Sequence, residues 1–518
     1  MTKPFAYDEL PYPGKFFVQT RPNRLAAIGI LYGMRPADAE HCRVLELGCG
    51  NGSNLIGQAY SLPASEFVGV DLARVHIEEA TSAAAELGLE NIEFQQMDLM
   101  DMTVNEFGKF DYVIAHGLLA WVPEFVRTRV MALFGELLNP NGIGYVSYNA
   151  YPGSHVREMM RSMMRFHTRG IDEPSKKVSD SMALLASIAK NLPDANPTKR
   201  IVVNEIGRHR GRPVADFYHD DLGDAYRPFY FYEIAEMLAE NGLQFLSEAE
   251  INSSSLQGLD KEAVARLEAA GSRTDREQYL DFFRGRVFRQ TLFCRSDIEL
   301  DEDPGPSALD DLYLLSTLRP KNGKADLSEG KVETFVSSRD QQIDIDHPLT
   351  KAALVKLGEA WGRSVKTPEL MIKARKALTA CGVKIVDWEQ QREIARKVLF
   401  QIAMGTDAII LDSHQPSART EPSERPRVDR LARWQVKQGT GVLTQLGLDL
   451  KLTDKPSHHL LTLLDGSHSR ADLAVEMRPF IESADDLSEN ERTDLLKDLP
   501  GWINRSIGQL ARLGVFDA

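Results

Sequence analysis

The chain has 518 residues, of which 43% are apolar and 26% charged, and its formal net charge is −14 at pH 7. The length exceeds what one hydrophobic core normally organises, so we expect about three domains, and the four cysteines form no C-x-x-C pair that would indicate a zinc site or a disulfide framework. The acidic balance argues against a nucleic-acid partner, and the absence of an apolar run of about 18 residues predicts a cytoplasmic protein with no membrane insertion.

The first informative elements are a strand, a glycine-rich turn and a second strand. Residues 44–47 read Val-Leu-Glu-Leu, and the turn Gly48-Cys49-Gly50-Asn51-Gly52 follows, where missing Cβ atoms let a ligand approach the backbone. The second apolar strand, residues 67–70, ends at Asp71, which lies 21 residues after Gly50. A carboxylate at this distance reaches a ribose diol in a βαβ unit, so the sequence predicts a nucleoside ligand.

An acid inside the first strand distinguishes this turn from a dinucleotide fingerprint. The order is Glu46-x-Gly48-x-Gly50-x-Gly52, whereas a dinucleotide site reads G-x-G-x-x-G. The pattern resembles motif I of class I S-adenosylmethionine-dependent methyltransferases. That resemblance implies S-adenosyl-L-methionine as the cofactor and a role for Glu46 in orienting the loop toward the ammonium group of the cofactor. It assigns the following residues to cofactor binding: Glu46, Gly48, Cys49, Gly50, Asn51, Gly52, Asp71 and Leu72.

The next elements follow in the order that this fold requires. We predict a helix over residues 74–87 and strands at 92–94, 110–115 and 144–148. In the methyltransferase family an acid after the third strand contacts the adenine amino group, which makes Asp98 the candidate, with Leu99 beside it. The alternative for Asp98 is an Asx turn.

Three further runs of residues narrow the resemblance to one group within this methyltransferase family. Residues 7–12, 115–123 and 145–153 resemble bacterial methyltransferases that carry a methyltransferase regulatory domain, a group that includes the rickettsial outer-membrane-protein lysine methyltransferases. The likeness covers roughly the first 295 residues well. The chain departs from the usual pattern at Leu119-Ala120, Ser154 and Arg21, which lie near the expected acceptor pocket. The resemblance therefore supports the family's cofactor better than it supports the family's substrate.

Two linkers divide the chain, an acidic, proline-containing one at 299–306 and a polar one at 413–428. We predict a Rossmann-like, seven-stranded α/β methyltransferase domain over 1–297. It carries a helical insertion at about 153–215, expected to be a lid or a homodimer contact, and a regulatory-domain-like segment at about 216–297.

The rest of the chain repeats a pattern of strand, helices and strand. It predicts a middle α+β module at 307–412 and a winged-helix-like module at 429–518. Residues 431–518 carry ten Lys and Arg against thirteen Asp and Glu. We therefore expect these modules to contact protein, with DNA as the lesser alternative.

Methyl transfer requires an acceptor aligned with the cofactor, and an amine acceptor must also have a free lone pair. Lysine, with a reference pKa of about 10.4, is nearly all protonated at neutral pH, so the site has to favour its neutral form. Acceptor-binding residues are expected at the carboxyl ends of the strands. The candidates are His116, Trp121, Tyr148 and Asn149, with Tyr151 beside them. His116 is also a cofactor candidate, Tyr12 is expected to fold over the cofactor, and His219 is a further candidate proton acceptor. Asp220 and His219 lack further ligands at metal spacing, so no metal site is expected.

These observations predict an S-adenosylmethionine-dependent methyltransferase acting on protein lysine nitrogens, with a protein or peptide substrate. Two alternatives stay open: an enzyme that methylates a small molecule or a peptide natural product, and a non-catalytic scaffold that senses the cofactor.

Overall fold

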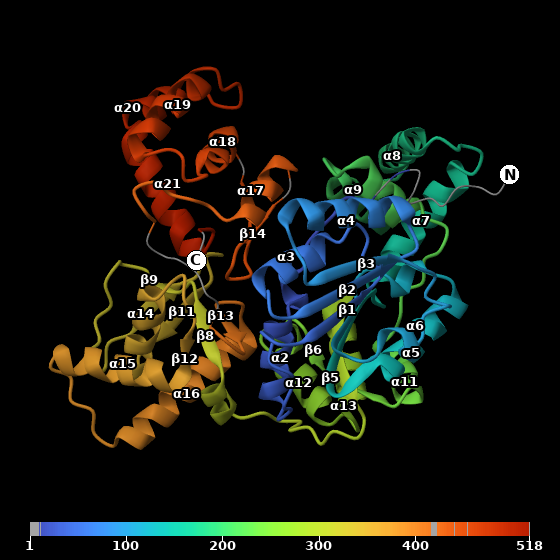
Figure 1. Cartoon of the computed structure of the whole chain (residues 1–518). Helices are drawn as coiled ribbons and strands as arrows, with labels where there is room; N and C mark the ends of the chain where they lie inside the picture. Colours follow the sequence, from blue (N-terminus) through green and yellow to red (C-terminus); the bar gives the residue numbers. More distant parts are fainter. Residues whose placement is uncertain (1–9, 11, 416–421, 440, 453, 517–518) are drawn as a thin grey trace.

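The computed structural model describes residues 10, 12–415, 422–439, 441–452 and 454–516. Most of the run at residues 7–12 therefore lies outside the described residues. Figure 1 shows a large α/β domain on one side, a middle domain beside it, and a C-terminal helical domain above the middle domain.

The large domain is built on a seven-stranded sheet with the strand order β3-β2-β1-β4-β5-β7-β6. The strands are β1 (Arg43–Leu47), β2 (Glu66–Asp71), β3 (Ile92–Gln96), β4 (Phe110–Ala115), β5 (Leu138–Asn149), β6 (Leu243–Glu248) and β7 (Phe288–Arg295). Strands β1 to β5 pair in parallel, and β7 runs antiparallel between β5 and β6. The predicted Rossmann-like class I methyltransferase fold is therefore confirmed.

Helices cover both faces of this sheet. They are α2 (Pro22–Leu31), α3 (Ser53–Ser61), α4 (Arg74–Leu87), α5 (Val104–Phe107), α6 (Glu124–Leu137), α11 (Phe231–Glu240), α12 (Lys261–Glu268) and α13 (Arg273–Arg284), with short turns η1 (Val18–Thr20), η2 (Leu119–Trp121) and η4 (Ile251–Ser254). Helices α12 and α13 connect β6 to β7 along the chain and were not predicted from the sequence. Strand β5 is also longer than predicted, because it includes residues 138–143.

A group of helices lies between β5 and α11. It consists of α7 (Ser154–His167), α8 (Pro174–Asn191), α9 (Pro197–His209), α10 (Val214–Phe217) and the π-helical turn η3 (Tyr218–Leu222). Met160, Met164 and Leu185 pack together in its core with Phe217, so the methionine cluster fills a hydrophobic interior. Figure 1 shows these helices at the end of the sheet near the N-terminal segment.

The middle domain has the elements η5 (Pro306–Asp311), β8 (Tyr313–Ser316), β9 (Arg319–Pro320), β10 (Glu333–Val336), β11 (Gln342–Ile345), α14 (Pro348–Glu359), β12 (Val365–Lys366), α15 (Thr367–Ala380), α16 (Trp388–Gly405) and β13 (Ile409–Asp412). Its core is continuous with the core under α2, since Leu25 and Ile28 belong to the same hydrophobic cluster as Leu314 and Leu354. The side chain of Asn23 donates a buried hydrogen bond to Asp412 at 2.8 Å. These two domains therefore form one packed body.

The C-terminal domain has its own core and contains α17 (Arg430–Lys437), β14 (Val442–Leu443), β15 (Asp449–Leu450), α18 (Lys455–Leu463), α19 (Arg470–Glu482), α20 (Glu489–Lys497) and α21 (Leu499–Leu513). It packs on the large domain through α17 and the β14–β15 hairpin. Leu431 lies against Ile56 and Leu87, and Leu443 is close enough to Gly57 that a Cβ there would lie 2.4 Å away. Much of the hairpin is thus buried against the methyltransferase domain.

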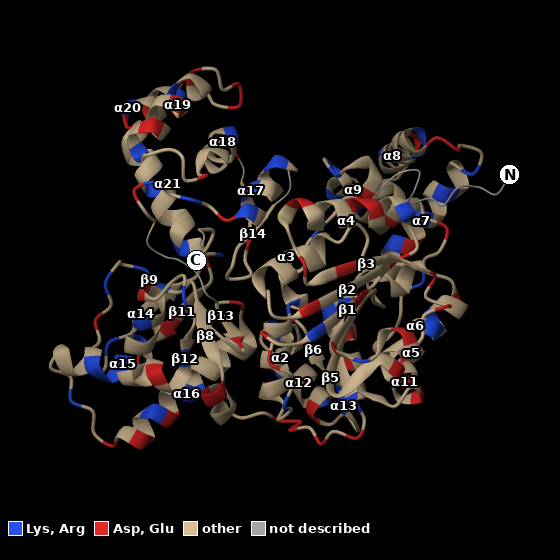
Figure 2. Ribbon diagram, in the orientation of Figure 1, with Lys and Arg blue, Asp and Glu red and all other residues tan. Residues whose placement is uncertain are grey.

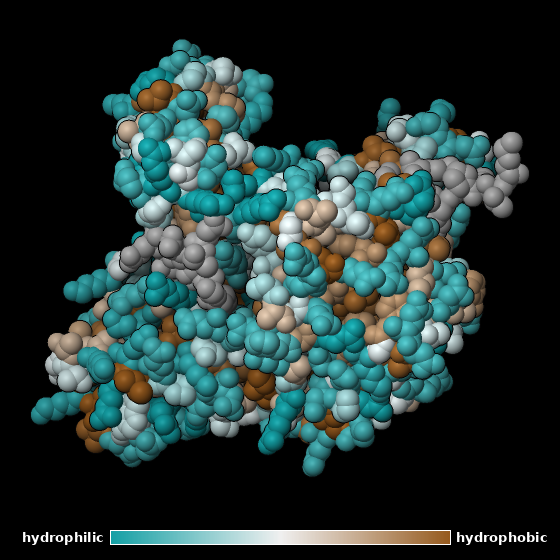
Figure 3. Space-filling view, in the orientation of Figure 1, coloured by the Kyte–Doolittle hydropathy of each residue, from teal (hydrophilic) through white to brown (hydrophobic). Residues whose placement is uncertain are grey.

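The face shown in Figures 2 and 3 is predominantly polar. In Figure 2, basic and acidic residues alternate along the helices of the C-terminal domain, with no basic face in this view. Hydrophilic side chains cover most of the face shown in Figure 3. Within the described ranges, none of the helices has both the length and the apolar character needed to traverse a bilayer.

Candidate active site

The glycine-rich turn leaves β1 and is held against β2 by the backbone. The N–H groups of Gly48 and Cys49 donate to the carbonyl of Val70 at 2.8 and 3.1 Å. Gly50 and Gly52 have φ values of 53° and 71°, a conformation that favours glycine. A Cβ on Gly52 would lie 2.4 Å from the ring of Phe94, whereas a Cβ on Gly50 would meet no atom within 4 Å. The turn is therefore tightly packed behind Gly52 and open in front of Gly50.

Asp71 fixes the position of this turn. One carboxylate oxygen accepts a hydrogen bond from the N–H of Gly50 and the other accepts one from Ala73, both at 2.8 Å. Leu72, the next residue, has 47% of its surface exposed. The acid at the tip of β2 is thus rigidly placed beside the open side of the turn, where the sequence analysis expected a ribose to bind.

Glu46 is the second acid at the turn and is almost fully buried, with 3% exposure. Its Oε1 accepts a hydrogen bond from Asn54 at 2.9 Å, while its Oε2 has no partner. Burial raises the pKa of this carboxyl to about 8, against the opposing effect of the Asn54 hydrogen bond. A buried acceptor without a partner is costly, and it suits a cationic group such as an ammonium.

The N-terminal segment, residues 12–17, lies over the turn. Asn54 accepts a hydrogen bond from the N–H of Phe17 at 2.9 Å. A Cβ on Gly14 would lie 2.4 Å from the side-chain oxygen of Asn51, so the backbone at Gly14 packs closely against that side chain. The hydroxyl of Tyr12 is 3.5 Å from Asp220. The segment therefore packs against the turn, and a contact of Tyr12 with the cofactor stays a prediction.

The carboxyl ends of β4 and β5 form the neighbouring part of the site. The ring of His116 stacks on Phe17 with the centroids 3.5 Å apart, and its Nδ1 is 2.8 Å from the hydroxyl of Tyr145. The ring of Phe288 is 6.1 Å away. Burial lowers the pKa of His116 to about 3, and the charge of Lys15 adds to this effect. His116 is therefore neutral at pH 7 and sits among aromatic rings.

The other candidate acceptor residues occupy different places. Tyr148 has 1% exposure, and its hydroxyl lies 3.0 Å from Thr291 within the core on the opposite face of β5, so the structure does not bring it to the site. Asn149 is buried at the end of β5, and its carbonyl accepts a hydrogen bond from Phe229. The tyrosine nearest His116 is Tyr145, because side chains alternate between faces along a strand.

Trp121 is covered by cations. Its ring is 4.9 Å from Tyr226, and the guanidinium groups of Arg157 and Arg161 lie 5.4 and 5.6 Å from its centroid. A further cation such as lysine would be repelled here. We therefore interpret Trp121 as a structural contact and not as the wall of a lysine channel.

His219 and Asp220 hold the N-terminal segment to the helical insertion. His219 Nε2 donates to the carbonyl of Leu10 at 2.6 Å, and Asp220 accepts from Arg212 at 2.6 Å as well as facing Tyr12. These contacts give both residues a positioning role.

Asp98 and Leu99 follow β3. The carboxylate of Asp98 accepts a hydrogen bond from the N–H of Met100 at 3.0 Å, the Asx turn that the sequence analysis gave as the alternative. The side chain is still exposed, so this turn does not prevent a contact with a ligand. Leu99 is buried in the core under β4.

Three residues of the site were missed from the sequence. Tyr145 and Phe288 contact His116, and Asn54 links Glu46 to Phe17. Strand alternation offered a signal for Tyr145, and the position of Asn54 in the first turn of α3 offered another. Phe288 is far away in sequence and gave no signal.

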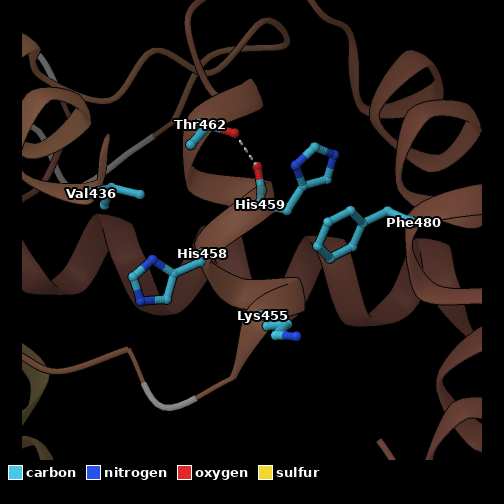
Figure 4. Close-up of a pocket in the computed structure, with 6 residues that line it drawn as sticks. All are labelled: Val436, Lys455, His458, His459, Thr462 and Phe480. Carbon is cyan, nitrogen blue, oxygen red and sulfur yellow. Dashed lines mark hydrogen bonds between the residues drawn. The ribbon is translucent and has the colours of Figure 1, made fainter. Parts of the chain in front are cut away.

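A separate hollow of about 270 Å³ lies in the C-terminal domain (Figure 4). It is lined by Val436, Lys455, His458, His459, Thr462 and Phe480. His459 stacks on Phe480 with the centroids 4.0 Å apart, and Lys455 is paired with Asp485. The hollow opens on the surface of this domain and shares no lining residue with the methyl-transfer site. Within the described residues, no group of three or more His, Cys, Asp or Glu is arranged to hold a metal ion.

Three family models match the chain. They are a methyltransferase domain at residues 38–195, a predicted methyltransferase regulatory domain at 216–295, and the PKMT C-terminal winged helix domain at 424–512. The last two agree with the regulatory segment and the winged-helix module expected from the sequence.

Relatives from Rickettsia match over long stretches. An uncharacterized protein of Rickettsia prowazekii (strain Madrid E) is 28% identical over 438 residues, which cover 83% of this chain and 78% of the relative. A second uncharacterized protein of that organism is 32% identical over 247 residues, which cover 47% of this chain and 98% of the relative. The structure of PKMT2 from Rickettsia typhi in complex with AdoHcy is 26% identical, with a TM-score of 0.86, and covers 98% of this chain and 100% of PKMT2.

Proposed function

Because this chain belongs to the family of S-adenosylmethionine-dependent methyltransferases that combine a regulatory domain with a PKMT winged helix, we propose that it methylates lysine side chains of a protein substrate. Methyl transfer itself follows from the family and from the similarity to PKMT2. The identity of the acceptor is the part that we propose, on the basis of the site and of the PKMT-type domain.

The residues at the turn fit S-adenosylmethionine. Glu46 offers a buried, unpartnered oxygen to the ammonium group, and the open side of Gly50 leaves room for the amino-acid tail. Asp71 would hold the ribose, and the exposed Asp98 would contact the adenine amino group. When bound, the cofactor supplies a methyl group on a sulfonium, which is electrophilic.

A buried, aromatic surrounding next to this turn is the observation that carries the lysine proposal. Phe17 and Phe288 flank His116, and Tyr145 lies within hydrogen-bond distance of it. Desolvation disfavours the ammonium form of lysine and thus lowers the pKa of an incoming side chain. With a pKa of about 3, His116 is too weak a base to deprotonate lysine at pH 7. We assign to it the orientation of the acceptor nitrogen, while the aromatic rings favour the neutral, nucleophilic form.

The helical insertion and the C-terminal domain are proposed to contact protein. An acidic chain tolerates a lysine-bearing partner, and the hairpin that could enter a DNA groove is buried against α3. We also retain a homodimer through α7–α9 as a prediction, which sedimentation velocity tests directly.

Label transfer separates the proposal from its alternatives. The protein is incubated with methyl-tritiated S-adenosylmethionine and a bacterial extract, and label is measured in protein and in the small-molecule fraction. We expect label in protein, on lysine after hydrolysis, and markedly less label with Asp71→Ala. Label only in small molecules would favour the alternative substrate class, and cofactor binding without transfer would favour a sensing scaffold.

A further inference from the structure

A continuous band of aromatic side chains lies on the surface beside the carboxyl end of β5. We name it the aromatic ridge, and it consists of Tyr151, His155, Tyr230, Tyr232, Tyr279 and Phe282. These residues come from the corner after β5, the start of α7, the N-terminal end of α11 and the last turns of α13.

The rings of the ridge are in contact in an unbroken series. Tyr151 stacks on His155 with the centroids 4.1 Å apart and lies 4.9 Å from Tyr230. Tyr230 is 6.1 Å from Phe282, which is 6.2 Å from Tyr279. Tyr232 stacks on Tyr230 at 5.5 Å. Three elements that are distant in sequence thus supply one surface.

Much of this surface is open to solvent. Phe282 is 46% exposed, Tyr232 42% and Tyr279 39%, and the neighbouring Val287 is 58% exposed. Scattered exposed apolar residues are normal in proteins, but a contiguous aromatic group marks a binding surface. Aromatic side chains with few rotatable bonds are the residues that dominate polypeptide interfaces.

The ridge leads directly to the methyl-transfer site. Ala150 donates a backbone hydrogen bond to the carbonyl of Val287 at 3.0 Å, which holds the Tyr151 corner against the start of β7. The next residue, Phe288, has its ring 6.1 Å from His116. A chain lying on the ridge would therefore pass over Val287 to reach the rings around His116.

The charged side chains at this end of the ridge are engaged with one another or with ridge residues. Glu158 accepts a hydrogen bond from the hydroxyl of Tyr151 at 2.9 Å and lies 3.4 Å from His155 Nδ1. Two basic side chains on the adjoining loops are already paired, Arg227 with Glu233 at 2.6 Å and Arg286 with Asp281 at 2.5 Å.

We infer that the aromatic ridge binds the polypeptide on one side of the acceptor lysine and selects lysines flanked by apolar or aromatic side chains. This inference rests on the proposed function. Its occupant is an extended segment of the substrate protein, because the ridge is continuous with the acceptor site.

Two synthetic peptides of equal length and charge test the inference. In one the single lysine is flanked by Phe and Leu, and in the other by Ser and Gly. The enzymes compared are wild type, Tyr230→Ser, Phe282→Ser and the control Phe166→Ser. Phe166 is 69% exposed on α7 and outside the ridge. Serine keeps the N-cap of α11 at position 230.

We expect wild type to prefer the apolar peptide in kcat/KM, and each ridge variant to lose about tenfold or more of that preference. The loss should appear in KM, with kcat on the polar peptide and cofactor affinity unchanged. Fluorescence anisotropy of the labelled apolar peptide, with S-adenosylhomocysteine present, measures binding without turnover and should weaken in parallel.

Equal use of both peptides by wild type, or an equal loss in Phe166→Ser, would overturn the inference while leaving lysine methylation intact. A ridge variant that turns a dimer into a monomer in sedimentation, with peptide preference unchanged, would assign the ridge to a second copy of the chain. If wild type methylated neither peptide and no protein lysine in the extract, the proposed function would fail as well.

Discussion

Replacing Glu46 with glutamine tests how the turn recognises the cofactor. Glutamine keeps the shape of the side chain and can keep the hydrogen bond from Asn54 to Oε1. It replaces the unpartnered Oε2 with an NH2 group, which repels an ammonium and does not titrate. Glu46→Gln therefore removes the charge and the proton equilibrium of this position together.

The pH dependence of stability follows from the pKa of about 8 in the native protein. An unfolded glutamate titrates near 4.3, so between these values the native state holds a proton that the unfolded state has released. The free energy of unfolding of the cofactor-free protein therefore falls as the pH rises from about 4.5 to 8, with a limiting slope of about 1.4 kcal/mol per pH unit. This contribution is absent in Glu46→Gln.

Cofactor binding should show the opposite trend. An ammonium beside Glu46 favours the carboxylate, so binding below pH 8 releases a proton from the wild type. Between pH 6 and 7.5 the affinity should rise by up to about tenfold per pH unit. The glutamine variant should bind at least about tenfold more weakly at pH 7.5, since a charge-assisted hydrogen bond is lost.

Calorimetry with S-adenosylhomocysteine in buffers of different ionisation enthalpy measures the released proton. At pH 6.5 we expect proton release by the wild type and none by Glu46→Gln, and urea unfolding across the same pH range gives the stability slopes. Identical proton release and identical slopes in the two proteins would refute the assignment of Glu46.

Three further changes have defined outcomes. Asp71→Ala removes the acceptor for Gly50 and should raise the cofactor dissociation constant at least about tenfold, so unchanged affinity in calorimetry would count against the ribose site. His116→Ala should lower kcat more than it lowers cofactor affinity. Because the pKa of His116 is about 3, wild-type turnover on lysine should rise with pH through 8 to 9 without an inflection near 6.5. An inflection near 6.5 would show that a histidine titrates during turnover. Gly57→Leu should displace Leu443, lower the melting temperature and enlarge the molecule in solution scattering, and a second change, Leu443→Ala, should partly restore both; independent effects would contradict the docked arrangement.

The sequence was sufficient for the sheet and for the cofactor turn, because both depend on local patterns. Apolar strands are recognisable from their composition, and the spacing of Gly50 and Asp71 is typical of a βαβ unit. Even the alternative for Asp98, an Asx turn, is visible in the order of residues after β3.

The acceptor side was harder to predict, because it is assembled from distant segments. Phe17 and Phe288 are separated by most of the domain, yet both contact His116. Tyr148 was a candidate acceptor-binding residue because of its position near the end of β5. Side chains alternate between the two faces of a strand, so Tyr148 points into the core and Tyr145 lies beside His116 instead. Strand register decides this outcome, and a β5 longer than expected made the register difficult to assign.

The docking of the C-terminal domain likewise depends on tertiary contacts. A winged-helix outline suggests DNA binding, whereas the burial of Leu443 and Leu431 against α3 and α4 directs this hairpin to the methyltransferase domain. No local pattern in the hairpin specifies that contact.

The central claim is methyl transfer to a lysine nitrogen, and blocking lysines tests it most directly. A bacterial extract is divided, and the lysines of one half are acetylated before both halves meet the enzyme and methyl-labelled S-adenosylmethionine. We predict that label enters protein only in the untreated half, as methylated lysine. Equal labelling of the two halves would contradict the account.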